Sequence, residues 1–126
     1  MRAVSIISTK GGVGKTTTAA NLGGFAADAG LRVLLLDLDV QPTLSSYFTL
    51  TKRAPAGIYE MLAYNEQRAE QLVSHTVIAG LDLVLSNDDR GELNTLLLHA
   101  PDGRLRLRHL LPTLAPRYDL LLIDTQ

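Results

Sequence analysis

The stretch STKGGVGKTTT near the amino terminus holds the residues of this 126-residue sequence that are best suited to chemistry. It matches the phosphate-loop pattern G-x-x-x-x-G-K-[ST] through Gly14, Lys15 and Thr16. The first glycine of the pattern is replaced by Thr9, and a second lysine that the pattern does not require, Lys10, follows it. The stretch therefore predicts phosphate binding and leaves the role of Lys10 to be explained.

Each residue type in this loop has a physical reason to be there. Glycines allow successive backbone N–H groups to point at phosphate oxygens, and the amino terminus of a following helix adds positive potential. Lys15 is expected to reach the β- and γ-phosphates, Thr16 to bind Mg²⁺ through its hydroxyl, and Thr17 to add a phosphate contact. A chance glycine-rich turn is the alternative. The expected nucleotide-binding residues are Gly11, Gly12, Val13, Gly14, Lys15, Thr16 and Thr17.

Three aspartates follow apolar runs, where a nucleoside triphosphate site needs carboxylates to hold Mg²⁺ and orient water. Asp124 closes the run LLLI, as a Walker B aspartate does, and is expected to hold Mg²⁺ through water. Asp39 ends a second apolar run and opens a loop, which suits a water-orienting or switch residue. Asp37 lies two residues earlier and faces the same side of a strand. Taken alone, each is equally an ordinary strand-terminal or helix-capping carboxylate.

The elements that must position these residues alternate between strand and helix patterns. Short apolar runs predict buried strands at 3–8, 31–39, 81–86 and 118–124, and an alanine-rich segment predicts a helix over 15–29, before Gly30. This alternation predicts an α/β fold, a doubly wound, mainly parallel sheet with flanking helices. The pair Gly23-Gly24 costs stability inside a helix, so we expect it to pack closely against the sheet.

The middle of the chain gives weaker patterns. Residues 41–50 indicate a loop with a short helix, and residues 57–67 and 68–77 both have helical character. Two further helices are expected at 91–100 and 103–114, with a kink or an end at Pro112. The three histidines, His75, His99 and His109, have no metal-ligand spacing and are expected to be surface or packing residues.

Composition excludes several classes of protein. The sequence is 46% hydrophobic and 20% charged with a net charge of −1, as in an ordinary globular protein, and it has no cysteine for disulfides, thiolate zinc sites or iron–sulfur clusters. Its apolar runs are shorter than the roughly 20 residues of a membrane helix, and the amino terminus lacks the features of a signal peptide. We expect a cytoplasmic protein.

The domain expectation is a single P-loop domain over residues 1–126. The chain stops two residues after Asp124, at the end of an apolar strand, where a buried parallel strand normally continues into a covering helix. The sequence is therefore expected to be the amino-terminal part of a longer protein, ending after the Walker B strand. The alternative is that a partner chain covers the open sheet.

Three segments resemble one known family. KGGVGKTT resembles the deviant Walker A motif of the ParA/MinD ATPases, DLDVQP their D-x-D-P-Q switch segment, and YDLLLIDTQ their Walker B strand. The order and spacing of the motifs make the resemblance specific, and it runs through the whole chain. ParA-type partition ATPases of chromosomes, plasmids or mobile elements are the most similar branch. Two positions depart from the family pattern. Val40 stands where the family usually has proline, and Gln126 follows Asp124-Thr125 where the family usually has Pro-Pro.

The resemblance implies a role for the second lysine. In this family the signature lysine, here Lys10, crosses the interface of an ATP-sandwich dimer and contacts the partner's nucleotide. Positive charge supplied in trans can be worth about 10³–10⁵ in rate. By the same resemblance Lys10, Lys15 and Asp39 are catalytic, with Asp39 positioning the attacking water. Mg²⁺ is assigned to Thr16, Asp39 and Asp124, and the cofactors are ATP, ADP and Mg²⁺.

The resemblance also implies partners. The expected function is a Mg²⁺-dependent ATPase that forms an ATP-dependent homodimer, binds DNA non-specifically, responds to a ParB-like protein and acts in DNA partitioning on the nucleoid. The family's base-recognising residues and basic DNA-binding residues mostly lie beyond Gln126. Alternatives are a nucleotide-binding scaffold without hydrolysis and a MinD-like positioning ATPase, which needs a carboxyl-terminal amphipathic helix. A nitrogenase-type reductase would need cysteines, and a tyrosine autokinase would need a tyrosine-rich tail.

Overall fold

Strands and helices alternate along the part of the chain that the computed structural model describes, which is residues 2–6, 13–38, 43–88, 92, 109–110 and 112–124. The strands are β1 (Arg2–Ile6), β2 (Val33–Asp37), β3 (Leu50–Lys52), β4 (Val73–Thr76), β5 (Leu81–Val84) and β6 (Leu120–Asp124). The helices are α1 (Val13–Asp28), α2 (Thr43–Tyr47), α3 (Ile58–Ala63), α4 (Ala69–Leu72) and the 3₁₀ turn η1 (Ala115–Arg117).

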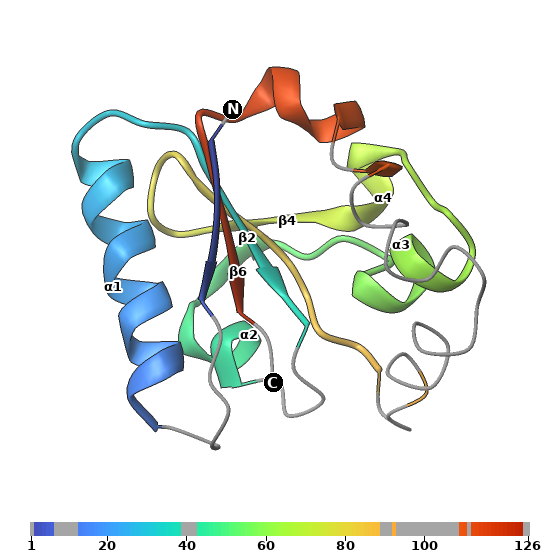
Figure 1. Cartoon of the computed structure of the whole chain (residues 1–126), viewed down its shortest axis with the longest axis horizontal. Coiled ribbons are helices and arrows are strands. Elements are labelled where there is room, and N and C mark those ends of the chain that lie inside the picture. The colour runs from blue at the N-terminus through green and yellow to red at the C-terminus, as the bar shows by residue number, and fades with distance from the viewer. Residues whose placement is uncertain are drawn as a thin grey trace.

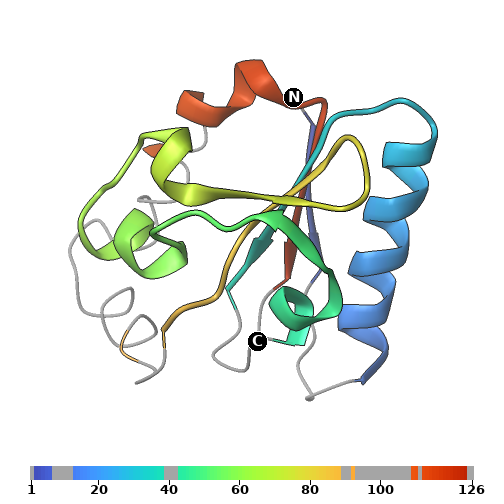
Figure 2. The same ribbon diagram turned by 180° about the vertical axis from the view of Figure 1, so that it is seen from behind.

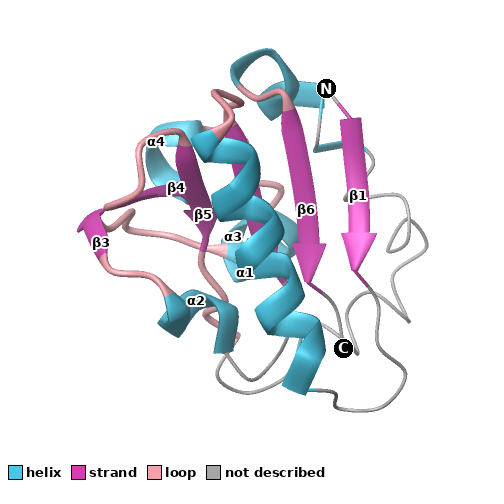
Figure 3. Ribbon diagram, turned by 90° about the vertical axis from the view of Figure 1, so that its left-hand side faces the viewer, coloured by secondary structure: helices cyan, strands magenta, loops and turns pink. Residues whose placement is uncertain are grey.

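The six described strands form one sheet in the order β1-β6-β2-β5-β4-β3. β1, β6, β2 and β5 are parallel to one another, whereas β4 pairs antiparallel with β5 and β3 pairs antiparallel with β4 (Figure 3). The expected mainly parallel α/β sheet is therefore confirmed, with β1 and β3 as its edge strands. The long sequence separation between β1 and β6 makes this edge pairing strongly non-local.

The prediction of helix over residues 68–77 is wrong for its second half. Only α4 is helical, and β4 follows it directly, pairing His75 with Asp82 of β5. Val73, Ser74 and Thr76 are buried while His75 is exposed, so burial along the segment does not follow a strict two-residue alternation. A four-residue helix joined to a four-residue strand gives neither period enough length to be recognised from sequence. The short β3 was missed for the same reason.

Apolar side chains cover both faces of the central strands. Leu34, Leu36 and Leu121 face the core that α3 and α4 close, together with Leu110 and Leu114. The alternate residues of the same strands form a second core, on the face of the sheet that α1 covers (Figures 1 and 2). Its members are Ala19, Ala20, Ala27, Val33, Leu35, Leu81, Leu83, Leu85 and Leu122. This two-sided burial explains why β2 has an almost unbroken apolar sequence.

The helix α1 lies close to the sheet at one of its two adjacent glycines. A Cβ on Gly23 would lie 3.1 Å from Leu35 Cδ2 and 3.2 Å from Leu81 Cδ1, so the expected close packing is confirmed there. It is wrong for Gly24, around which nothing lies within 4 Å of an added Cβ. Gly30 has a φ of 92°, which terminates the helix in the left-handed region as the sequence predicted.

Hydrogen bonds to the end of β5 position the amino terminus of α3. The N–H of Ile58 donates to the carbonyl of Leu85 at 2.8 Å, and the N–H of Tyr59 donates to Asn87 Oδ1 at 2.9 Å. Glu60 Oε1 accepts from the N–H of Gly57 at 2.9 Å, which is the reciprocal half of a capping box. The first turn of this expected helix is therefore fixed to the same sheet edge that carries the candidate site.

The expected helix at 91–100 lies outside the described residues apart from Glu92, which is helical. Of the expected helix at 103–114, residues 109–110 and 112–114 are described and helical. Leu110 and Leu114 are 2% and 1% exposed and belong to the core, as their four-residue spacing predicted. The helical turn runs into η1 before β6 begins.

Candidate functional site

The carboxyl ends of the parallel strands gather the candidate site at one edge of the sheet. The first turn of α1, the ends of β2 and β6, and α2 all lie along this edge (Figures 1 and 2). In a parallel α/β sheet this edge is where ligands bind, because the loops after the strands converge there. The arrangement follows from the sequence, since each predicted site residue comes directly after a strand or opens a helix.

The register of the sheet brings two of the aspartates together. Asp37 and Asp124 are partners across the parallel pair β2–β6, and the N–H of Leu38 donates to the carbonyl oxygen of Asp124 at 2.9 Å. Side chains alternate along each strand, and Leu35 and Leu122, two residues earlier, both belong to the core under α1. Both carboxylates therefore lie on the α1 side of the sheet, where the loop begins its helix.

Both carboxylates are removed from solvent. Asp37 is 0% exposed and Asp124 is 1% exposed, whereas aspartate is rarely so deeply buried in proteins. Burying negative charge is costly unless the carboxylates are hydrogen-bonded, paired or close to a metal ion. A pair of buried carboxylates at the end of two strands, beside the amino terminus of α1, has the donor chemistry that Mg²⁺ prefers.

Ser45 connects Asp37 to two other elements. Its N–H and its hydroxyl both donate to Asp37 Oδ2, at 2.9 and 2.6 Å, and its hydroxyl oxygen accepts from the N–H of Ser86 at 2.9 Å. One serine of α2 is thus hydrogen-bonded to the last residue of β2 and to the segment after β5. Sequence reasoning missed Ser45, and the only signal for it was a hydroxyl residue eight positions after Asp37 in the expected short helix.

The structure brings together some of the predicted nucleotide-binding residues and leaves others undescribed. Val13, Gly14, Lys15, Thr16 and Thr17 form the beginning of α1, so a helix does open within the loop motif. Their backbone N–H groups belong to the helix terminus, where partial positive charge accumulates. The remaining predicted residues, Lys10, Gly11, Gly12 and Asp39, lie outside the described residues.

A second polar constellation lies at the opposite ends of the parallel strands. Tyr118 donates its hydroxyl hydrogen to Asp82 Oδ2 at 2.7 Å, and Asp82 Oδ1 lies 2.8 Å from His75 Nδ1. Burial, followed by the hydrogen bond to Asp82, raises the pKa of Tyr118 well above its ordinary value. Nothing in the sequence pattern singled out these three residues as a group, because β4 was not expected.

No cluster of three or more metal-ligating His, Cys, Asp or Glu side chains occurs among the residues that the structure describes. A protein site for Mg²⁺ commonly has one or two carboxylates, completed by water and phosphate oxygens, so two aspartates are enough to make this edge a candidate. Within the same residues, no helix is long and apolar enough to span a membrane.

Comparison with protein families gives one match over the whole chain. The profile of a family described as an AAA domain matches residues 1–126. Among curated proteins, the chain is 36% identical over 124 residues to the chromosome partitioning protein ParA of Myxococcus xanthus, covering 98% of this chain and 44% of that protein. It is 35% identical over 137 residues to a putative replication protein A of Sinorhizobium fredii, covering 98% and 34%.

Solved structures agree in fold. A cobyrinic acid a,c-diamide synthase from Mycobacterium smegmatis with bound ADP and magnesium has a TM-score of 0.86 and 29% identity, covering 98% of this chain and 50% of that one. A plasmid partition protein from Borrelia burgdorferi has a TM-score of 0.78 and 28% identity, covering 98% and 55%. The chain thus spans about half the length of these relatives or less.

Proposed function

This chain belongs to the AAA domain family of ParA- and MinD-like P-loop ATPases, and on that premise we propose that it binds and hydrolyses ATP with Mg²⁺. The observation that carries the proposal is the meeting of Asp37 and Asp124, both buried, beside the helix that opens within the phosphate-loop motif. An M. smegmatis structural relative holds ADP and magnesium, which supports the same pair of ligands here.

Each residue of the motif then has one task. The backbone at Gly11, Gly12 and Gly14 surrounds the phosphates, and Lys15 neutralises charge on the β- and γ-phosphates. Thr16 would hold Mg²⁺ through its hydroxyl, and Asp124 would hold it through water. When bound, this ion offsets the negative charge that develops on the phosphate oxygens.

Asp39 and Asp37 have different roles in this proposal. Asp39 orients the attacking water and contributes to the magnesium shell, which places it close to the transferred phosphoryl group. Asp37 is a positioning residue, because its carboxylate is hydrogen-bonded to Ser45 on α2. The two aspartates bracket the start of the segment that leads from β2 into α2.

We infer that Lys10 acts across a homodimer. A lysine beside the phosphate loop, and additional to Lys15, supplies positive charge to a nucleotide held by the partner, as an arginine finger does. The active form is then an ATP-sandwich dimer. Lys10 contributes to hydrolysis only when two chains meet, so turnover depends on association.

The biological role that fits these properties is DNA partitioning. Relatives named for chromosome partitioning and plasmid partition support this role, since they match nearly the whole of this chain. In the proposal, ATP-bound dimers bind DNA non-specifically on the nucleoid, and a ParB-like protein stimulates hydrolysis. The relatives are about twice as long or longer, so DNA contacts of the intact protein are assigned to regions beyond the present sequence.

The test is ATP binding and turnover by the intact protein. Calorimetry with ATP and Mg²⁺ measures binding, and phosphate release measures hydrolysis. Lys15→Ala should abolish both, whereas Asp39→Ala should keep binding and reduce the turnover number by about 10²-fold or more, as removal of a water-orienting group does. Asp28→Asn, a change at the far end of α1, serves as the matched control and should leave both unchanged.

Two results would redirect the proposal. Binding without phosphate release, in the presence of DNA and a ParB-like protein, would make the chain a nucleotide-binding scaffold. Unchanged turnover in both Lys15→Ala and Asp39→Ala would refute the proposed mechanism altogether.

A further inference from the structure

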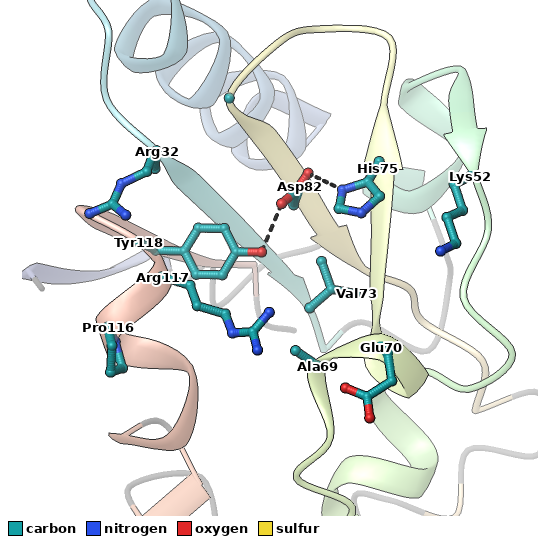
Figure 4. A pocket seen from close by; sticks show the side chains of 11 residues that line it. Arg32, Lys52, Ala69, Glu70, Val73, His75, Asp82, Pro116, Arg117 and Tyr118 are labelled. Atoms are coloured by element: carbon teal, nitrogen blue, oxygen red, sulfur yellow. Dashed lines mark hydrogen bonds and ion pairs between the residues drawn. The ribbon is translucent and has the colours of Figure 1, made fainter.

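A cleft of about 500 Å³ lies at the edge of the sheet opposite the candidate nucleotide site. It is formed where β2, β5 and β6 begin, and it is closed by α4 and η1 on the side of the sheet away from α1 (Figure 4). Its volume falls within the range of small-molecule sites, about 300–1,000 Å³. The nucleotide motif lies at the other ends of the same strands, so the cleft is separate from it.

Two cationic side chains line this cleft. Arg117 comes from η1 and points toward Ala69 and Val73, and Lys52 comes from β3, on the other side of β4 (Figure 4). Neither side chain forms an ion pair or hydrogen bond with any other residue that the structure describes. Arg32 also lines the cleft, but its guanidinium is bonded to Asp119 and points away. The two free cations are therefore available to a ligand.

The wall of the cleft contains two largely buried side chains and a group of hydrogen-bonded polar residues. Tyr118 is 7% exposed, and its ring forms the floor with Val73, which is 6% exposed. The hydroxyl of Tyr118 and the ring nitrogen of His75 both contact Asp82, at 2.7 and 2.8 Å. These contacts engage both oxygens of Asp82. Asp82 and Glu70 are the two acidic residues of the lining, and no hydrogen bond from a described residue engages the carboxylate of Glu70.

We propose that this cleft binds a small anion through a carboxylate or phosphate group held between Arg117 and Lys52. Arginine offers paired donors and lysine a compact charge, and both are common ligands of such oxyanions. The ring of Tyr118 and the side chain of Val73 offer an apolar surface to the remainder of the ligand. The volume of the cleft suits a small molecule better than the extended surfaces that macromolecules cover.

The cleft and the candidate nucleotide site lie at opposite ends of the same strands. Tyr118 precedes β6 by two residues, and Asp82 lies in β5. β6 ends in Asp124 and lies between β1 and β2, so a ligand in the cleft touches the beginnings of strands whose other ends carry the candidate catalytic edge.

The experiment titrates the intact protein with citrate and, separately, with inorganic phosphate, without Mg²⁺, following the resonances of His75 and Tyr118 by NMR. Arg117→Gln and Lys52→Gln should each weaken binding about tenfold, the loss expected for one charge-assisted contact. Glu70→Gln should tighten it by removing the opposing charge. Arg53→Gln removes an exposed positive charge beside Lys52 but outside the cleft, and it should have no effect.

The lysine of the phosphate loop provides a second control. Lys15→Ala should leave binding in the cleft unchanged, so that failure of the proposed ATPase activity and failure of the cleft are distinguishable. Saturable binding of either probe with the stated variant effects supports the proposal, and the preferred probe tells which acid group is recognised. Absence of saturation by both probes up to about 10 mM, or equal weakening by Arg53→Gln and Arg117→Gln, would overturn it.

Discussion

At the scale of single residues, Ser45 carries more of the site's geometry than its sequence context suggests. Three hydrogen bonds converge on it, two to Asp37 and one from the backbone of Ser86. Because Asp37 is fully buried, the hydroxyl also meets part of that carboxylate's need for donors. Ser45 therefore links α2 to the end of β2 and to the segment after β5, and we propose that it positions the candidate site.

Ser45→Ala should lower the turnover number for ATP while leaving ATP affinity nearly unchanged, because it displaces α2 without touching the phosphate loop. Loss of the hydroxyl should also cost about 1–2 kcal/mol of unfolding free energy. Steady-state kinetics and urea unfolding measure the two effects. Ser45→Thr, which keeps the hydroxyl, should restore turnover, and Ser46→Ala on the same helix is the control. Equal kinetics for the two alanine variants would count against the positioning role.

Tyr118 gives a prediction at alkaline pH. Burial and the hydrogen bond to Asp82 raise its pKa in the folded protein above the unfolded value of about 10. A raised folded pKa means that its contribution to stability is complete below about pH 10 and is lost as pH rises through the folded pKa. Tyr118→Phe should destabilise the protein by about 1–2 kcal/mol at neutral pH and reduce the loss of stability above pH 10.

Thermal unfolding at a series of pH values measures this effect, with Tyr64→Phe as the exposed control. An unchanged alkaline profile in Tyr118→Phe would show that the hydroxyl of Tyr118 is not the group concerned. The same variant tests whether the wall of the anion cleft depends on the contact with Asp82.

At the scale of elements, the adjacent glycines of α1 offer a matched pair. Gly24 has nothing within 4 Å of an added Cβ, whereas the methyl groups of Leu35 and Leu81 lie 3.1–3.2 Å from an added Cβ on Gly23. Gly24→Ala should stabilise the protein by about 0.5–1 kcal/mol, because alanine favours the helix and restricts the unfolded chain. Gly23→Ala should not give this stabilisation, because the added methyl group would crowd the side chains of Leu35 and Leu81. Urea unfolding of the two variants measures the difference, and equal stabilities would contradict the close packing of α1 at Gly23.

The amino-terminal ends of β2 and β6 are joined by one ion pair. Arg32 donates from its N–H and Nε to Asp119 Oδ2, at 2.9 and 3.3 Å, and from Nη2 to Oδ1 at 3.2 Å. The backbone of Asp119 donates in return to the carbonyl of Arg32 at 2.8 Å. The side-chain hydrogen bonds from Arg32 are the main cause that lowers the pKa of Asp119.

Asp119→Asn should therefore lower the melting temperature slightly at neutral pH, since the pair is exposed and screened by salt. Because the pKa of Asp119 is lower in the folded protein than in the unfolded chain, the ion pair stabilises the fold fully only above the unfolded pKa of about 4. This stabilisation is lost as pH falls through the folded pKa. The difference between variant and parent should shrink in acid, which makes low pH the internal control. A difference that grows below pH 4 in differential scanning calorimetry would contradict this account.

At the scale of the whole molecule, the proposed dimer rests on Lys10. Lys10→Ala should spare ATP binding by the single chain and remove ATP-dependent dimerisation and stimulated hydrolysis, because the lysine acts on the partner's nucleotide. Analytical ultracentrifugation with a slowly hydrolysed ATP analogue measures association, and Arg53→Gln controls for the loss of a surface charge. Normal dimerisation and turnover of Lys10→Ala would leave the lysine as a surface charge without a catalytic role.

Much of the arrangement followed from sequence periodicity and motif order. The apolar runs that became β2, β5 and β6 were long enough to identify strands, and a glycine with positive φ ended α1 where the sequence indicated. The short antiparallel strands β3 and β4 were missed because three or four residues do not establish a period. The identity of the nucleotide-binding residues remains a prediction from the motif.

The sequence by itself determined that a phosphate loop precedes a helix and that aspartates close two buried strands, because those features are local. Only the tertiary structure decided that Asp37 and Asp124 are neighbours, since 87 positions separate them and the register of β2 against β6 brings them together. The same holds for the bond from Ser45 to Asp37 and for the cleft between Arg117 and Lys52. Contacts between distant segments depend on strand order and side-chain alternation, which no local pattern specifies.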